Sequence, residues 1–165
     1  MSPPLQFGRA DPGIDYVTRP TAFGLVFRDR RLACVRVTRD TPYHDLPGGA
    51  VDGAETEEQA LVREFMEETG MTIEPVERLV EAGQYFRKSD GEPVNNVGGI
   101  WIARMTALDP ARKVENDHEL VWLHPRTALA DLRHDAHAWA VTTWLRRQTK
   151  RGHMERYGSD PADPW

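Results

Sequence analysis

GAVDGAETEEQALVREFMEETGM, residues 49–71, carries the strongest structural signal in this sequence of 165 residues. Its second half predicts a helix over residues 57–69. Thr56 and Gln59 stand at the spacing of a capping box, in which each side chain bonds the backbone amide of the other residue. Gly70 suits the left-handed conformation in which many helices end. The helix therefore has a defined start and a defined end.

Three carboxylates share one face of this predicted helix, because Glu64, Glu67 and Glu68 are spaced i, i+3 and i+4. Neighbouring like charges at this spacing weaken a helix by about 0.2 to 0.5 kcal/mol per pair. A hard divalent cation would compensate, since Mg²⁺ takes oxygen ligands and bridges carboxylates to phosphates. For three helical glutamates alone, a solvated acidic surface is the alternative interpretation.

The segment before the helix, YHDLPGGAVDGAE over residues 43–55, is predicted to be a loop. Gly48 and Gly49 would let the backbone approach a metal or a phosphate without a Cβ in the way. A simple Pro-Gly-Gly turn is the alternative.

The spacing Gly49, five residues, Glu55, seven residues, then REFMEETGM from Arg63 onward resembles the complete Nudix box. The resemblance to the Nudix hydrolase family implies an α/β fold, an α/β/α sandwich around a central mixed sheet. It also implies hydrolysis of a phosphoanhydride bond in a nucleoside diphosphate linked to another moiety, with Mg²⁺ as cofactor and Mn²⁺ as a substitute. The expected partner is a small phosphorylated nucleotide-type substrate.

By the same resemblance, the metal ligands are the Gly48 carbonyl and the three helical carboxylates Glu64, Glu67 and Glu68. Arg63 lies one turn from Glu67, so it can hold that carboxylate in place. Glu55 is expected to be a second orienting partner. Gly48 and Gly49 are also expected to contact substrate.

Family members often recruit one further acid from a downstream loop. The segment KVENDHELVWL, residues 113–123, offers Glu115, Asp117 and Glu119. Glu119 is followed by Trp122 in the family's Glu-x-x-Trp arrangement, so it is predicted to be the extra ligand or the general base, with Glu64 as the other candidate base. The alternative is that all three acids belong to a surface loop.

Substrate recognition is predicted around Tyr85 and Arg87, on a strand where family members often place base-stacking residues, whereas Phe86 is expected to pack in the core. Subgroup markers for ADP-ribose, dinucleoside polyphosphates and coenzyme A do not match, so the sequence leaves the substrate open. His134 and His137 stand three apart on a predicted helix. A packed or solvated pair is favoured there over a metal site, because no further ligand stands at suitable spacing.

The rest of the chain follows from periodicity and turn residues. Residues 1–18 are expected to be an irregular lead-in, residues 19–150 the catalytic domain, and residues 151–165 a flexible tail. The other predicted elements are a hairpin of strands 21–28 and 31–37, strands 79–87, 97–105 and 119–123, and helices 125–132 and 134–148.

Composition limits the possible partners. A net charge of −5, from 21 basic and 26 acidic residues, does not suit extended nucleic-acid binding. Membrane association is not expected, because the sequence has neither a signal-peptide pattern nor a run of about 20 apolar residues. A cytoplasmic protein is expected, and a homodimer is left open.

Two rival functions remain on the same scaffold. Isomerisation of isopentenyl diphosphate would call for a cysteine, and Cys34 is the one cysteine in the sequence. It lies in an apolar run that predicts core packing. A non-catalytic nucleotide-sensing domain is the second rival, although such domains commonly lose parts of the box, which is intact here.

Overall fold

The structure is a computed structural model that describes residues 3–157, with side chains described through residue 152. Its strands form two sheets. The larger sheet has the order β1 (Leu5–Phe7), β7 (Met71–Arg87), β8 (Pro93–Leu108), β2 (Val17–Leu25) and β6 (Gly48–Ala50). In this sheet β1 with β7 and β2 with β8 pair in parallel, and the other pairs are antiparallel. The sheet is therefore mixed, as expected.

The second sheet is organised around β4 (Arg31–Val37), which pairs antiparallel with β3 (Phe27–Arg28), β5 (Tyr43–Asp45) and β9 (His118–Leu123). The remaining elements are α1 (Glu57–Thr69), a short 3₁₀ turn η1 (Pro110–Arg112), α2 (Pro125–Asp131) and α3 (Asp135–Tyr157).

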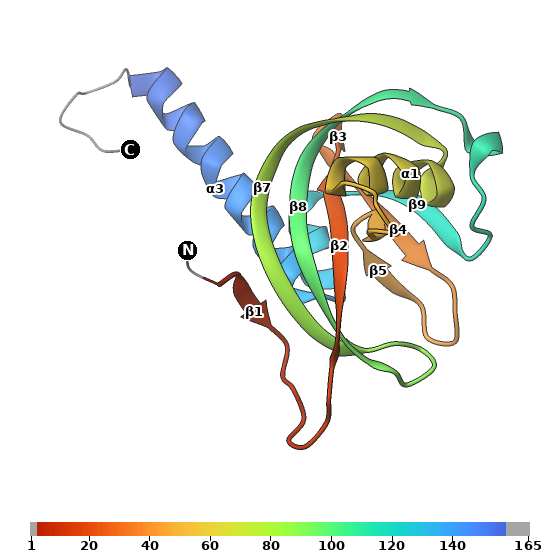
Figure 1. The fold of residues 1–165 in the computed structure, drawn as a ribbon. Helices are drawn as coiled ribbons and strands as arrows, with labels where there is room; N and C mark the ends of the chain where they lie inside the picture. Colours follow the sequence, from red (N-terminus) through yellow and green to blue (C-terminus); the bar gives the residue numbers. More distant parts are fainter. Residues whose placement is uncertain (1–2, 158–165) are drawn as a thin grey trace.

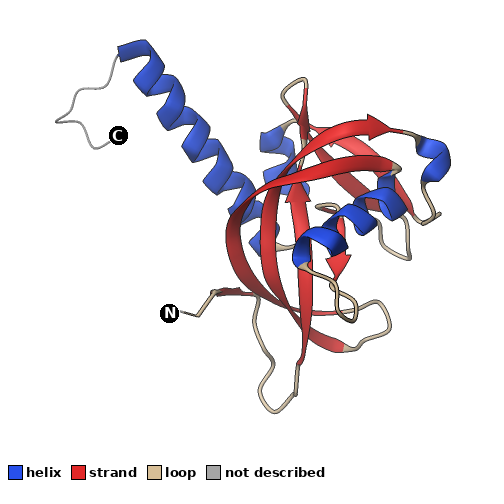
Figure 2. Cartoon of the chain, turned by 45° about the horizontal axis from the view of Figure 1, so that its top comes forward, coloured by secondary structure: helices blue, strands red, loops and turns tan. Residues whose placement is uncertain are grey.

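Helices cover both sides of the sheets (Figure 1). On one side, Leu61 and Phe65 of α1 pack with Ala22 of β2 and Met71 of β7 in a buried apolar cluster. On the other side, residues of α2 and α3 enclose a second cluster. The layers match the expected α/β/α sandwich. Figure 2 shows α3 extending beyond the sheets.

The α1 helix forms as predicted. Thr56 Oγ1 accepts from the Gln59 amide at 3.2 Å, and the Gln59 side chain accepts from the Thr56 amide at 2.9 Å. Gly70 ends the helix in the left-handed region with φ 75°, and a Cβ there would lie 2.2 Å from the Asp109 carbonyl oxygen. Backbone conformation and close packing both require glycine at this position.

The predicted hairpin is divided between the two sheets. Its first strand breaks at Val26, so β2 pairs with β8, whereas β3 forms the hairpin with β4. The connecting residues Asp29 and Arg30 both have positive φ, as a tight two-residue turn requires. Apolar patterning predicted the strand but not the change of sheet.

Several boundaries differ from the sequence prediction. The predicted loop 43–55 contains the short strands β5 and β6. Strands β7 and β8 are nearly twice as long as expected, because register shifts near Thr72, Val76 and Leu79 interrupt the two-residue alternation that the prediction used.

The two ends of the domain are also more regular than expected. Within the predicted lead-in, β1 pairs in parallel with β7, and the Gln6 amide donates to Asn95 Oδ1 at 2.9 Å. Helix α3 runs to Tyr157, past the predicted boundary at residue 150. The rest of the predicted tail lies outside the described residues. Within residues 3–157, none of the helices has the length and apolar character that a membrane crossing requires.

Candidate functional site

A pocket of about 220 Å³ opens where the two sheets, α1 and the start of α3 meet. Its walls combine three kinds of side chain. The acids are Asp45, Glu64, Glu68 and Glu115; the cations are Arg19, Arg39, Lys88 and Arg133; the aromatic rings include Phe23, Tyr43 and Phe86. One pocket thus offers groups suited to a metal, to phosphates and to a planar ring.

Arg63 bonds several carboxylates at once, including Glu67, the contact that the sequence predicted. Its Nε and Nη2 bond the two oxygens of Glu55 at 2.7 and 3.0 Å. Its Nη1 bonds Glu64 at 2.9 Å and Glu67 at 3.1 Å, and Nη2 also donates to the Ala50 carbonyl at 2.9 Å. A planar guanidinium with five donors can hold several acids at once, which an ammonium cannot do in the same geometry. Glu55 is the second orienting partner that the sequence suggested.

The glycine pair lies directly against the carboxylates. The Gly48 amide donates to Glu68 Oε2 at 3.0 Å, and its φ of 138° is a backbone conformation that favours glycine. A Cβ on Gly49 would lie 2.7 Å from the carboxyl carbon of Glu64. Glycine at both positions lets the backbone and the acids approach closely.

Burial shapes the electrostatics of these acids. Glu64 is 8% exposed and Glu68 is 5% exposed. Burial raises the pKa of Glu64, although the Arg63 guanidinium partly opposes this effect. Burial also raises the pKa of Glu68 well above its ordinary value, with the Gly48 amide as the main opposing contact. A bound cation would offset the cost of burying these charges.

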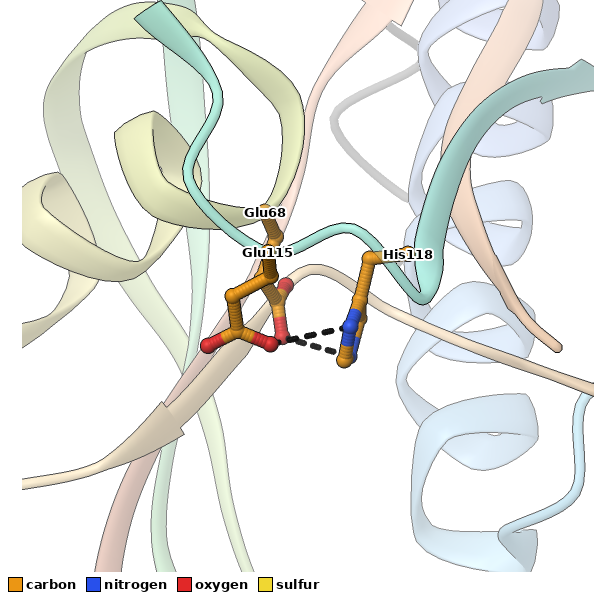
Figure 3. A group of neighbouring side chains, drawn as sticks. All are labelled: Glu68, Glu115 and His118. Atoms are coloured by element: carbon orange, nitrogen blue, oxygen red, sulfur yellow. Dashed lines mark ion pairs between the residues drawn. The ribbon is translucent and has the colours of Figure 1, made fainter. Parts of the chain in front are cut away.

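The loop that follows η1 brings two more ligand-type side chains to the cluster (Figure 3). The amides of Val114 and Glu115 both donate to the Glu67 carbonyl, at 2.8 and 2.9 Å, so the loop is fixed to the C-terminal end of α1. Lys113 Nζ donates to the carbonyls of Glu115 and His118 at 2.8 and 2.6 Å. These contacts hold Glu115 and His118 beside α1.

Two groups of ligand atoms result, and Glu115 belongs to both. Ligand atoms of Glu64, Glu67 and Glu115 lie within 4.8 Å of one another, as do those of Glu68, Glu115 and His118. His118 Nδ1 lies 2.9 Å from Glu115, and its Nε2 lies 3.4 Å from Glu68. The first group consists of oxygen donors, which fits a hard divalent cation such as Mg²⁺.

Glu119 is not part of this cluster, so its predicted position is wrong. Its side chain is 61% exposed and lies 3.7 Å from Arg36, its cross-strand neighbour on β4. Successive residues of a strand point to opposite faces, so His118 faces the carboxylates while Glu119 faces away. The extra acid in the pocket is Glu115, which the sequence offered as a weaker candidate. His118, the first residue of β9, was missed because a single histidine has no distinguishing pattern in the sequence.

On β7, the residue that lines the pocket is Phe86, which lies between the two residues that were predicted to contact substrate. Tyr85 packs edge-on against Tyr16 with ring centroids 5.0 Å apart, and Arg87 pairs with Asp11 at 3.0 Å. Neither lines the pocket, whereas Phe86 does. The expectation that Phe86 packs in the core is therefore wrong as well. The prediction placed Tyr85 and Arg87 on the face of β7 that meets the pocket, whereas Phe86 is on that face.

The histidine pair is packed, as favoured. His134 and His137 are 4% and 3% exposed. Burial lowers the pKa of His134 to about 2 and that of His137 to about 3, so both rings are neutral near pH 7. His137 Nδ1 accepts from the Leu46 amide at 3.3 Å, and the His134 ring contacts Phe86.

Comparison with known proteins identifies the family. The family model of the NUDIX domain matches residues 17–145. The chain belongs to the Nudix hydrolase family. The resemblance that rested on the box is thereby confirmed over most of the chain.

Individual relatives support the same assignment. A protein of Bacillus subtilis (strain 168) named "Putative 8-oxo-dGTP diphosphatase" is 45% identical over 49 residues. That match covers 30% of this chain and spans only about a third, 33%, of the relative. Similarity to this relative therefore covers a segment and not the whole protein.

Solved structures extend the similarity to most of the chain. A MutT NUDIX hydrolase from Burkholderia pseudomallei has a TM-score of 0.58 and 29% identity, covering 76% of this chain and 97% of the other. The MutT protein from Methanosarcina mazei Go1 has a TM-score of 0.65 and 19% identity, covering 82% and 99%. The predicted α/β Nudix fold is confirmed by this agreement.

Proposed function

We propose that this chain hydrolyses a phosphoanhydride bond in a nucleoside diphosphate linked to another moiety, with Mg²⁺ as cofactor and Mn²⁺ as a substitute. One observation carries the proposal: Glu64, Glu68 and Glu115 lie in the same pocket as several cations and aromatic rings. A substrate with phosphates next to a planar base needs this combination.

The residues of the site have separate proposed roles. Arg63 and Glu55 hold the carboxylates of α1 in position. Arg19 has no ion-pair partner among the described residues, and together with Lys88 at the pocket wall it can bind phosphate oxygens. Glu64, Glu67, Glu68, Glu115 and the Gly48 carbonyl would hold Mg²⁺, which supplies charge neutralisation and an acidified water when bound. Glu64 or Glu115 would accept a proton from the attacking water.

Purified protein incubated with a nucleotide panel tests this function. The panel contains nucleoside triphosphates, nucleotide sugars, dinucleotides and capped RNA, each with Mg²⁺, with Mn²⁺ or with EDTA. We expect cleavage products for at least one class with Mg²⁺ or Mn²⁺ and none with EDTA, and the Glu68→Gln protein serves as the blank. Binding without cleavage across the panel would instead support the nucleotide-sensing alternative.

Arg63→Ala should lower kcat/KM by about 10- to 100-fold and weaken Mg²⁺ binding, because loss of an orienting partner misplaces ligands that remain present. Steady-state kinetics across a Mg²⁺ titration measures both effects. Arg63→Lys should recover little, since an ammonium cannot bond Glu55 bidentately while holding Glu64 and Glu67. Wild-type metal dependence in Arg63→Ala would contradict this role.

Cys34 does not suit the isomerase alternative. It is fully buried on β4, and burial raises the pKa of its thiol to about 12. We expect no reaction of the native protein with a thiol reagent at pH 8, full reaction in denaturant, and turnover of Cys34→Ala within about twofold of wild type, since reactivity requires the thiolate. Rapid labelling of the native protein with concurrent loss of activity would reopen the alternative.

A further inference from the structure

The second group of ligand atoms, from Glu68, Glu115 and His118, differs from the first because it contains a nitrogen. Its members come from three elements: Glu68 from the end of α1, Glu115 from the loop after η1, and His118 from the start of β9. Figure 3 shows both carboxylates pointing toward the imidazole ring. The Mg²⁺ ligands proposed above include the two carboxylates but leave the imidazole unused.

The His118 ring is oriented through its Nδ1 atom. Asp117 Oδ1 forms a hydrogen bond with Nδ1 at 2.8 Å, and Arg39 pairs with Asp117 in turn. A carboxylate that accepts the Nδ1–H leaves the lone pair of a neutral imidazole on Nε2. Metal-binding histidines are oriented in the same way, by an acceptor on the ring nitrogen that does not bind the metal. The contact with Asp117 therefore prepares Nε2 to be a ligand.

The Nε2 atom lacks a hydrogen-bond partner. Within residues 3–152, the imidazole makes its hydrogen bond through Nδ1, whereas Nε2 lies 3.4 Å from Glu68 Oε1 without forming one. The side chain of His118 is 9% exposed and lines the pocket. Two acceptor atoms that face each other in a buried site are unfavourable unless a proton or a cation lies between them. The unpartnered nitrogen thus indicates a bound ligand.

The distance between Nε2 and Oε1 indicates the class of cation. Zn²⁺ binds imidazole and carboxylate at about 2.0 to 2.2 Å, usually with tetrahedral geometry. Two ligand atoms that each lie about 2.1 Å from one ion are about 3.4 Å apart at the tetrahedral angle, but only about 3.0 Å apart at the octahedral angle that Mg²⁺ requires. The separation of 3.4 Å matches the tetrahedral value.

We propose that His118, Glu68 and Glu115 form a second cation site that binds Zn²⁺ or a similar transition-metal cation, with water in the fourth position. His118 provides the selectivity, because imidazole suits Zn²⁺ whereas carboxylates alone suit Mg²⁺ and Mn²⁺. Glu68 and Glu115 are shared with the Mg²⁺ ligands of the proposed function, so the two cations compete for them. The inference rests on neither hydrolysis nor Mg²⁺ binding.

Metal titration of the full chain, stripped with EDTA and then dialysed, tests the site without turnover. Co²⁺ substitutes for Zn²⁺ in tetrahedral sites, and its visible absorption bands report a four-coordinate geometry. Wild-type protein should develop these bands with equimolar Co²⁺ and lose them when Zn²⁺ is added. Calorimetry then gives the dissociation constants of Zn²⁺ and Mg²⁺. Absence of the bands, or Zn²⁺ binding no tighter than Mg²⁺ binding, would overturn the proposal.

Variants locate the site. His118→Gln should lose the Co²⁺ bands and lower the preference for Zn²⁺ over Mg²⁺, measured as the ratio of their dissociation constants, by at least about 100-fold. Asp117→Asn should weaken Zn²⁺ binding by about 10- to 100-fold, because it removes the orienting partner. Glu119→Gln is the matched control, since Glu119 follows His118 on β9 but is exposed, and it should keep the wild-type ratio. An unchanged ratio in His118→Gln would refute the assignment.

NMR of the wild-type protein covers the case in which His118→Gln does not fold. Imidazole ¹H–¹⁵N correlation spectra distinguish the two nitrogens of each histidine ring. Zn²⁺ should shift the Nε2 resonance of His118 while its Nδ1 stays protonated, and the buried rings of His134 and His137 should not respond. A simple ion pair between His118 and Glu68 predicts no such shift. A His118 ring that does not respond to Zn²⁺ would therefore contradict the proposal.

The two proposals fail differently. If Zn²⁺ binds through His118 but the nucleotide panel gives no cleavage with Mg²⁺ or Mn²⁺, hydrolysis is refuted and the second cation site stands. If nucleotides are cleaved with Mg²⁺ but Zn²⁺ binding is the same in wild type and His118→Gln, the second cation site is refuted and hydrolysis stands.

Discussion

Glu68→Gln should reduce kcat by about 10³-fold or more, equivalent to about 4 kcal/mol of transition-state stabilisation. The glutamine keeps the shape of the side chain and can still accept from the Gly48 amide, which bonds Glu68 Oε2 at 3.0 Å. It removes the negative charge that would bind Mg²⁺. Glu67→Gln should behave similarly, because Glu67 belongs to the group of oxygen ligands that includes Glu64 and Glu115.

Although Glu68→Gln should lower activity, it should raise the stability of the metal-free protein. Burial raises the pKa of Glu68 above its ordinary value of 4.5. The folded state therefore binds this proton more tightly than the unfolded state does. Ionisation of Glu68 lowers the stability of the folded protein, and this loss increases as pH rises above 4.5 toward the folded pKa. In EDTA, the melting temperature of Glu68→Gln should exceed that of wild type at neutral pH, and the two should converge in acid.

Kinetics at saturating Mg²⁺ and melting curves at several pH values measure both effects. Glu58→Gln is the control, since Glu58 lies on the same helix but is exposed. It should retain wild-type turnover. Undiminished turnover of both Glu68→Gln and Glu67→Gln at saturating Mg²⁺ would refute α1 as the metal platform.

Glu115→Gln should reduce kcat/KM by about 100-fold or more, while Glu119→Gln should remain within about twofold of wild type. Glu115 belongs to both groups of ligand atoms, and its backbone amide donates to the Glu67 carbonyl of α1. Glu119 points away from them toward Arg36, in an exposed pair that contributes little. The two substitutions are chemically identical and lie four residues apart, so each controls for the other.

The form of the loss separates two roles for Glu115. A lost metal ligand should raise the Mg²⁺ concentration for half-maximal rate and allow partial rescue by excess metal. A lost base should lower kcat with little change in metal affinity, and part of the rate should return at high pH as hydroxide becomes available. Wild-type activity of Glu115→Gln together with loss of activity in Glu119→Gln would contradict the placement of Glu115, and not Glu119, in the carboxylate cluster.

Local chemistry determined the parts of this protein that the sequence predicted well. The capping pair Thr56 and Gln59, the terminal Gly70 and the spacing of the three helical glutamates all act within a few residues. Such short-range effects do not depend on the rest of the fold. They were sufficient to predict α1, its acidic face, the contact of Arg63 with Glu67 and the family.

The remaining features were decided by tertiary structure, because each depends on which face of a strand or loop meets a distant element. A one-residue shift on β7 exchanges Tyr85 for Phe86 in the pocket, and alternation on β9 turns His118 inward and Glu119 outward. Glu115 reaches the cluster only because its loop bonds the end of α1, about 50 residues earlier in the chain. Asp45 of β5 and Asn96 of β8 likewise line one pocket only because the two sheets pack together.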